Sequence, residues 1–118
     1  IEEADEDFLV YSGNDNFALP LLAAGGHGVV SVGAHIAGSQ MRNMIRAYLD
    51  GDIAEAGRLH RDLIKLDAVM FCDTNPIPVK AALNMMGIQV GSLRLPMTEA
   101  DGAVKETVRA ELARRGLL

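Results

Sequence analysis

Four residues that could bind a small ligand follow the first apolar run of the sequence. That run spans residues 8–11 (FLVY), and Ser12-Gly13-Asn14-Asp15 closes it. In proteins that alternate strands and helices, ligands bind at the carboxyl ends of the strands, and glycine there lets a ligand approach the backbone closely. The same residues are also typical of an ordinary strand-to-helix turn, in which Asn14 or Asp15 caps the next helix.

Lysine forms imines with carbonyl substrates, and this chain contains Lys65, Lys80 and Lys105. An imine-forming lysine needs a desolvated site that lowers its pKa, and we expect such a lysine at the end of a strand. All three lysines fall in helical patterns instead. The sequence therefore predicts no catalytic residue within this segment.

The remaining reactive side chains form no recognisable cluster. His27, His35 and His60 show no metal-ligand spacing with one another or with Cys72, so we predict no metal site. His35 follows the second predicted strand, but an ordinary loop histidine is the simpler interpretation, and we expect His60 to be solvated on a long helix. Neither Ser31 nor Cys72 has a base and an orienting acid, so nucleophilic catalysis is not predicted.

The elements that position these residues begin with a strand, a helix and a strand. Residues 8–11 and 29–32 are short apolar runs typical of buried parallel strands, and residues 17–24 predict a helix between them. Residues 25–28 (GGHG) precede a strand rather than a helix, so they predict a tight turn and not a phosphate site. This order favours a parallel βαβ unit with a right-handed crossover.

Four further helices are predicted after the second strand. The first begins at the cap Ser39 and ends at Gly51, and the second spans residues 53–71. The third is capped by Asn75, has Pro76 and Pro78 in its first turn, and ends at Gly87. Residues 93–96 are expected to be extended. A capping box at residues 98–101 then opens the last helix, which carries Val104, Val108 and Leu112 inward and ends at Gly116.

Two strands are too few for a sheet beneath this many helices. We therefore expect further strands before Ile1, and the absence of an initiator methionine leads us to expect a chain cut from something longer or processed. The 49% content of hydrophobic residues is high for one small domain, and part of that surface is expected to meet something absent here.

Composition and charge exclude several classes of function. The net charge is −5 and the 11 basic residues are not clustered, so nucleic acid is not an expected partner. No apolar stretch approaches the roughly 18 residues of a membrane span. The single cysteine excludes an intrachain disulfide, which agrees with a cytoplasmic location.

Four segments of the chain, in order and at similar spacing, resemble the dihydrodipicolinate synthases. They are residues 8–15 (FLVYSGND), 25–31 (GGHGVVS), 75–80 (NPIPVK) and 93–98 (LRLPMT). The last two segments are specific for this branch, whereas the strand motifs occur throughout a superfamily that includes N-acetylneuraminate lyase. The resemblance covers residues 7–118.

The resemblance implies an α/β fold, namely the C-terminal portion of a (β/α)₈ TIM barrel. Residues 8–11 and 29–32 would be barrel strands 7 and 8. Residues 1–50 would contain the last two βα units, and residues 51–118 would form a C-terminal helical appendage.

The resemblance further implies a lyase that condenses pyruvate with aspartate semialdehyde through a lysine Schiff base, in the pathway to diaminopimelate and lysine. The catalytic lysine would lie upstream of Ile1. Val30 and Gly13 match residues that line the pyruvate pocket, and the backbone carbonyl of Val30 would lie beside pyruvate. No cofactor is implied. The partners would be the two substrates, the remainder of the barrel and further copies in a homotetramer.

Two departures from the family pattern lie beside this pocket. Asn14 stands where many members have the first of two aspartates, and Gly33-Ala34-His35 replaces a threonine, alanine, asparagine run. A related pyruvate-dependent aldolase with another aldehyde acceptor is thus an alternative. So is a truncated, non-catalytic binding or assembly module. An independent helical domain is disfavoured by the pairing of NPIPVK with LRLPMT.

Overall fold

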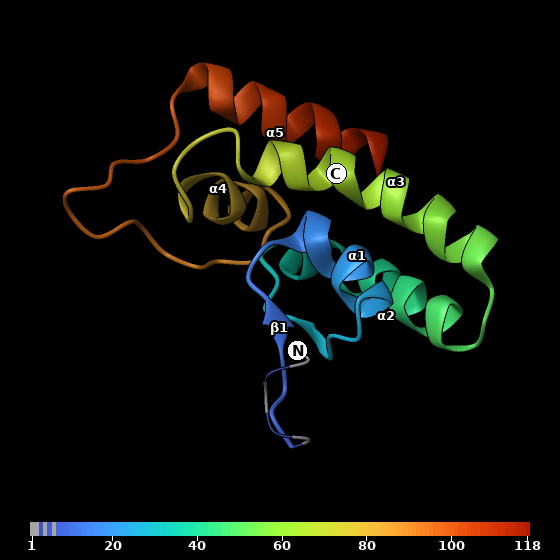
Figure 1. Ribbon diagram of the computed structural model, residues 1–118. Coiled ribbons are helices and arrows are strands. Elements are labelled where there is room, and N and C mark those ends of the chain that lie inside the picture. The colour runs from blue at the N-terminus through green and yellow to red at the C-terminus, as the bar shows by residue number, and fades with distance from the viewer. Residues whose placement is uncertain (1–2, 4, 6) are drawn as a thin grey trace. The chain divides into compact units, whose positions relative to one another are not determined.

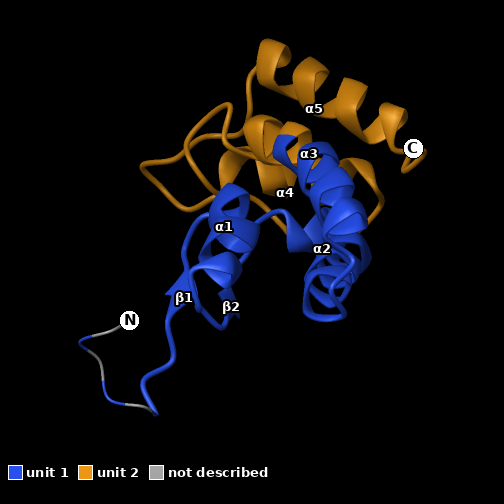
Figure 2. Ribbon diagram, turned by 45° about the vertical axis from the view of Figure 1, so that its right-hand side comes forward, with its two compact units in different colours: residues 1–64 blue, residues 65–118 orange. Residues whose placement is uncertain are grey.

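The structure, a computed structural model, describes residues 3, 5 and 7–118 of the chain (Figure 1). Its elements, in chain order, are β1 (Tyr11–Ser12), the 3-10 helix η1 (Asp15–Phe17), α1 (Ala18–Ala23), β2 (Gly28–Val29), α2 (Ala34–Leu49), α3 (Ile53–Met70), α4 (Ile77–Met85) and α5 (Gly102–Arg114). Contacts between residues divide the chain into two units, residues 1–64 and 65–118 (Figure 2). The predicted division at residue 50 follows the family barrel instead, and it stays a prediction.

The first unit contains a parallel pair of strands joined by η1 and α1. The pairing places Tyr11 opposite Gly28 and Ser12 opposite Val29. The ladder continues beyond β2, where the Val30 N–H donates to the Ser12 carbonyl at 2.8 Å. The predicted strand-helix-strand order with parallel pairing is therefore confirmed.

Both strands are shorter than predicted. The apolar runs 8–11 and 29–32 indicated four residues each, but each strand has two and is displaced by one or more positions. Among the described residues β1 and β2 have only each other as partners. Phe8 and Leu9, at the start of the first apolar run, are 64% and 52% exposed. A strand forms only where a neighbour supplies hydrogen bonds, so the outer parts of both runs stay unpaired.

Helix α2 begins earlier than the predicted cap at Ser39. The Ser31 hydroxyl accepts a hydrogen bond from the Ala34 N–H at 2.8 Å, so it satisfies a free donor in the first turn. Non-helical backbone at Ala37 then kinks the helix, and the predicted helix corresponds to the part after this kink. The helix ends before Gly51, as predicted, because this residue has a φ of +84° that favours glycine.

The predicted helix at residues 53–71 is confirmed as α3, whose N-terminus is capped by Asp52. One carboxylate oxygen of Asp52 accepts a hydrogen bond from the Glu55 N–H at 3.0 Å. The buried apolar residues of the first unit are small aliphatic side chains and methionine: Ala18, Leu22, Ile36, Ala37, Met41, Met44, Ala56 and Leu63.

In the second unit, α4 ends before Gly87, as predicted, but Asn75 does not cap it. Pro76 occupies the capping position and makes no side-chain cap bond, and Pro78 lies in the first turn. The Ile77 N–H donates to the Thr74 carbonyl at 2.8 Å. A backbone turn thus takes the place of the expected side-chain cap.

The last helix, α5, starts later than the predicted capping box. Its cap is Asp101, which accepts a hydrogen bond from the Val104 N–H at 2.8 Å, whereas Thr98 lies outside the helix. Helix α5 packs against α4. Val108 and Leu112 are fully buried as predicted, but Val104 is only half-buried. Residues 93–96 contain neither helix nor strand. Among the described residues, no helix has both the length and the apolar character needed to cross a membrane.

Candidate functional site

The loops that follow β1 and β2 form the candidate site. Because the two strands are parallel, their carboxyl ends lie at the same edge. Residues 13–15 leave β1 at this edge, and residues 30–33 leave β2. The structure therefore brings together the two segments that contain the predicted ligand-binding residues Gly13 and Val30.

Gly13 and Val30 are both open to their surroundings. A Cβ atom added to Gly13 would meet no atom within 4 Å. Val30 is 73% exposed, and its N–H is bound to the carbonyl of Ser12, the neighbour of Gly13. The geometry is compatible with a shared pocket wall, and the role of these two residues in binding stays a prediction.

Asp15 connects the two loops, which the sequence did not indicate. Its side chain is 3% exposed, and Oδ2 accepts hydrogen bonds from the N–H groups of Val32 and Gly33, both at 3.0 Å. The sequence predicted Asn14 or Asp15 as a helix cap. Asn14 does hold the capping position of η1, but its side chain makes no cap bond. No local signal in the sequence indicates this cross-loop contact, because it depends on the parallel pairing of β1 with β2.

Ser12 and Ser31 have structural partners. The Ser12 hydroxyl donates to the Asn14 carbonyl at 2.8 Å and accepts from the Asn14 N–H at 3.1 Å, which shapes the turn after β1. Ser31 is occupied by the Ala34 N–H at the start of α2. The expectation that Ser31 is not a nucleophile stays a prediction.

The histidines lie apart from any recognisable catalytic cluster. His35 is exposed in the first turn of α2, so it is a helical residue rather than the expected loop residue. His60 was expected to be solvated, but it is half-buried and lines a cavity of about 240 Å³ with Leu19, Tyr48 and Ile53. This burial lowers the pKa of His60, and the neighbouring Arg61 lowers it further. Among the described residues, no group of three or more His, Cys, Asp or Glu could hold a metal ion.

Cys72 is exposed after the end of α3. Partial burial of its thiol raises the pKa, and the Asp73 carboxylate raises it further. The nucleophilic thiolate is therefore disfavoured, and the expectation that Cys72 is not a catalytic nucleophile stays a prediction.

The three lysines all lie in helices, as predicted. Lys65 is an exposed residue of α3, Lys80 belongs to α4, and Lys105 belongs to α5. None of them lies at the end of β1 or β2. No described lysine therefore has the position that imine chemistry at the strand ends would require.

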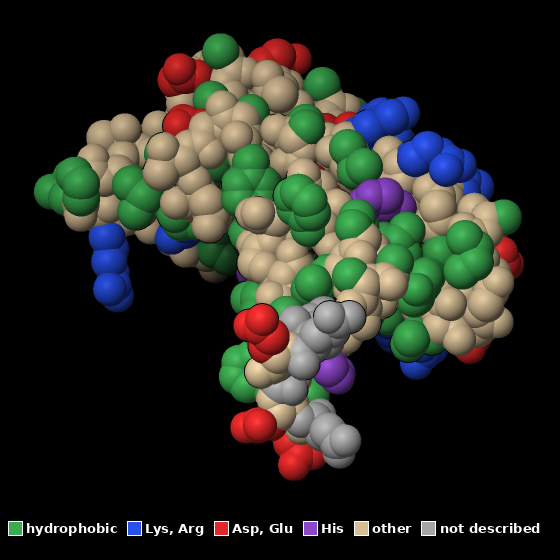
Figure 3. Space-filling model, in the orientation of Figure 1, with side chains coloured by type: hydrophobic (Ala, Val, Ile, Leu, Met, Phe, Trp, Pro, Cys, Tyr) green, Lys and Arg blue, Asp and Glu red, His purple; other side chains and the backbone are tan. Residues whose placement is uncertain are grey.

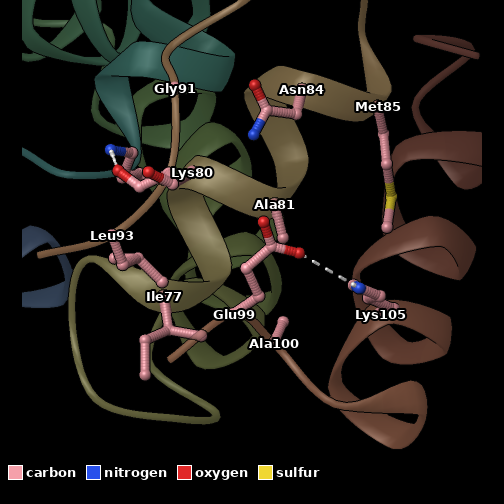
Figure 4. Close-up of a pocket in the computed structure, with 11 residues that line it drawn as sticks. Ile77, Lys80, Ala81, Asn84, Met85, Gly91, Leu93, Glu99, Ala100 and Lys105 are labelled. Atoms are coloured by element: carbon pink, nitrogen blue, oxygen red, sulfur yellow. Dashed lines mark hydrogen bonds and ion pairs between the residues drawn. The ribbon is translucent and has the colours of Figure 1, made fainter. Parts of the chain in front are cut away.

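Lys80 and Lys105 line a cavity of about 290 Å³ in the second unit, together with Ile77, Asn84, Leu93 and Glu99 (Figure 4). Its polar groups already have partners within the unit. Lys80 donates to the Ser92 carbonyl, Lys105 pairs with Glu99 at 3.7 Å, and the Asn84 Oδ1 accepts from the Val90 N–H at 3.1 Å. Such contacts are those of a packed loop, and they assign no ligand to this cavity.

Comparison with known proteins identifies the family. Residues 1–115 match the model of the dihydrodipicolinate synthetase family. The chain belongs to this family. It is 48% identical over 118 residues to 4-hydroxy-tetrahydrodipicolinate synthase of Moorella thermoacetica, covering 100% of this chain and 40% of that protein. With the synthase of Desulforudis audaxviator it shares 49% identity over 113 residues, covering 96% and 38% of the two chains.

Solved structures of the dihydrodipicolinate synthase family match the arrangement of the elements. The synthase of Thermotoga maritima superposes with a TM-score of 0.94 at 44% identity, covering 99% of this chain and 40% of that one. The enzyme of Cyanidioschyzon merolae, crystallised with lysine bound, gives a TM-score of 0.94 at 41% identity, with coverage of 99% and 40%. The chain thus spans about two fifths of the length of these relatives.

Proposed function

We propose that this chain is a segment of a lyase that condenses pyruvate with aspartate semialdehyde through a lysine Schiff base. Its observed relatives are 4-hydroxy-tetrahydrodipicolinate synthases. The observation that carries the proposal is the open edge at the ends of β1 and β2, where Gly13 and Val30 stand uncovered. The segment supplies one wall of the pyruvate pocket, and the imine-forming lysine lies upstream of Ile1.

In the proposed enzyme, β1 and β2 are strands 7 and 8 of a (β/α)₈ barrel. Helix α2 is the eighth barrel helix, and α3, α4 and α5 form the C-terminal appendage. The surface of the segment supports this arrangement, because many apolar side chains are exposed on it (Figure 3). Phe8, Leu9 and Tyr11 are at least half exposed, although strands of a parallel sheet are normally covered on both faces. The remainder of the barrel is the proposed cover.

In the proposed enzyme, this segment contacts pyruvate through its backbone. The carbonyl of Val30 lies beside bound pyruvate, and Gly13 leaves room for the substrate because it lacks a side chain. The chemistry requires no metal or cofactor. When the carbon next to the imine loses a proton, the imine accepts the electron pair that is left, and the enamine forms. By family analogy the enzyme is a homotetramer, and the single cysteine of this chain fits a cytoplasmic location.

A related aldolase with a different aldehyde acceptor is a second candidate. Asn14 and His35 are two of the residues that depart from the family pattern, and both are exposed near the strand ends. Exposed side chains at that edge can contact the acceptor without disturbing the fold. Turnover of aspartate semialdehyde compared with other small aldehydes separates the two candidates.

A non-catalytic assembly module is a third candidate. Exposed apolar residues such as Phe8, Val30 and Leu95, the last 88% exposed, would then bind a partner, for example a complementary barrel fragment. Size-exclusion chromatography of the 118-residue chain alone and with residues of the missing barrel tests this. A well-folded monomer with no exposed apolar surface would contradict it.

Borohydride trapping tests the proposed reaction. A full-length protein containing this segment, treated with pyruvate and borohydride, is expected to gain one pyruvate-derived adduct per chain. Peptide mapping should place the adduct on a lysine outside residues 1–118, and the chain alone should gain none. A stoichiometric adduct on Lys65, Lys80 or Lys105 would overturn the proposal.

A further inference from the structure

The carboxylate of Asp15 fixes the loop after β2 from the end of β1. Its Oδ2 accepts two hydrogen bonds at 3.0 Å, from Val32 N–H and Gly33 N–H, which lie 17 and 18 residues further along the chain. Hydrogen bonds to an ionised acceptor are about twice as strong as neutral ones, and a buried location strengthens them further. The contact is therefore a strong link between the two loops, and among the described residues no other side-chain hydrogen bond joins them.

Val30 lies between two such anchors. On one side its own N–H is bound to the Ser12 carbonyl at 2.8 Å. On the other side the chain is held again at Val32, only two residues later, by Asp15. The Val30 carbonyl belongs to the peptide unit between these anchors, so its position depends on both of them.

The other carboxylate oxygen of Asp15, Oδ1, does not hold the backbone. Oδ1 is buried and has no hydrogen-bond partner in the structure. Burying a carboxylate oxygen without a donor is costly, and the two bonds of Oδ2 must offset that cost. The side chain thus has one observable role, which is to hold the backbone of Val32 and Gly33.

We propose that Asp15 is a positioning residue for pyruvate binding, acting through the loop that places the Val30 carbonyl. This inference rests on the proposed function, in which that carbonyl lies beside pyruvate. Asp15 itself does not contact the substrate. Its loss is expected to weaken pyruvate binding and to leave the chemistry of the bound complex largely intact.

The test uses the full-length protein and two variants, Asp15→Ala and Asp15→Asn. The measured quantity is the pyruvate concentration that gives half-maximal borohydride-trapped adduct, together with the trapping rate at saturation. Asp15→Ala removes both bonds, and we expect the half-saturating concentration to rise about tenfold or more. Asp15→Asn keeps a neutral acceptor, so a smaller rise of about threefold is expected. The rate at saturating pyruvate should stay within about twofold, because a positioning residue acts on binding.

Asp52→Ala is the matched control. Asp52 also accepts a backbone N–H bond at 3.0 Å, but at the start of α3 rather than in the loops after β1 and β2. Its loss should lower stability without changing the half-saturating pyruvate concentration. If Asp15→Ala does not fold, the half-saturating pyruvate concentration of Asp15→Asn tests the proposal on its own.

The outcomes separate the two levels of the proposal. Folded Asp15 variants that trap pyruvate with wild-type concentration dependence would overturn the positioning role while leaving the proposed function in place. Failure of the wild-type protein to form any adduct would overturn the proposed function itself. A rise in half-saturation in the Asp15 variants but not in Asp52→Ala is the supporting result.

Discussion

The ammonium of Lys80 donates a hydrogen bond to the backbone carbonyl of Ser92. Lys80 is the last residue of the NPIPVK segment, and Ser92 directly precedes the LRLPMT segment. The two segments most specific for the family are therefore joined in space by one side chain. Residues 91–100 contain no helix or strand, so no regular ladder of backbone hydrogen bonds holds them in place.

Removing this link should loosen the loop locally. In Lys80→Ala the Ser92 carbonyl loses a charged donor, and because the contact is solvent-accessible we expect a cost of about 1 kcal/mol. Amide hydrogen exchange should accelerate in residues 91–96 and much less in α4. Lys65→Ala, which removes an exposed lysine from α3, is the control and should change stability by no more than about 0.5 kcal/mol. Unchanged exchange in residues 91–96 would contradict the role of Lys80.

Replacing Glu111 is expected to destabilise the fold more than replacing any other acidic residue of α5. It accepts hydrogen bonds from Arg114 at 2.7 Å and from Arg115 at 2.8 Å, and the side chains of Glu111 and Arg115 are only 8% and 5% exposed. Glu111→Ala takes a carboxylate away from a buried guanidinium, which should cost about 3 kcal/mol. Glu106→Ala breaks an exposed pair with Arg109 in the same helix and should cost about 0.5 kcal/mol or less. Urea unfolding of the two variants makes the comparison.

Glu111 should also contribute to acid sensitivity. Burial alone would raise the pKa of Glu111, but the hydrogen bonds from Arg114 and Arg115 outweigh it and hold the pKa below its usual value. A carboxyl with a lowered folded-state pKa stabilises the fold above its unfolded pKa, about 4.3. That contribution is lost as pH falls through the folded pKa. Glu111→Gln should therefore flatten the dependence of unfolding free energy on pH below about pH 5. An unchanged dependence would contradict the assignment.

His60 should make the stability of the fold depend on pH in a range closer to neutral pH. Burial lowers its pKa first, and Arg61 adds to the shift, so the folded state prefers neutral imidazole. As pH falls below about 6.5, the unfolded chain binds a proton more readily and stability decreases until the folded pKa is reached. His60→Gln should remove this decrease, and Arg61→Gln should reduce it because the second cause is gone. Thermal unfolding between about pH 7.5 and 5 measures both.

The sequence predicted the element order well because the signals for it are local. Apolar runs, a 3.6-residue period and the glycines at positions 51, 87 and 116 depend only on neighbouring residues, and those three glycines have positive φ as helix ends require. The caps were harder to predict. Asn75 and Thr98 have suitable side chains, but the backbone at Pro76 and the carboxylate of Asp101 fill those positions instead.

The contact at the centre of the candidate site could not be predicted from local patterns. Asp15 and Val32 are 17 residues apart, and only the parallel pairing of β1 with β2 brings them together. The same reasoning explains the strand lengths, since residues 8–9 are apolar but pair with no strand within the described part of the chain. Apolar patterns indicate which residues prefer burial, whereas the partner decides whether they form a strand.

Two glycines near the strands provide the last test, because replacement by alanine should destabilise the fold at one of them and not at the other. A Cβ on Gly26 would lie 2.3 Å from Cγ of Leu21, so Gly26→Ala forces α1 or the turn to shift and should cost about 1–3 kcal/mol. Gly13 has neither a positive φ nor an atom within 4 Å of an added Cβ, so Gly13→Ala should change the unfolding free energy by no more than about 0.5 kcal/mol. The fold of this segment therefore does not require glycine at position 13. If Gly13 faces pyruvate as proposed, Gly13→Ala should fold normally and still raise the half-saturating pyruvate concentration in the full-length protein. Normal folding with unchanged pyruvate binding would remove Gly13 from the proposed pocket wall.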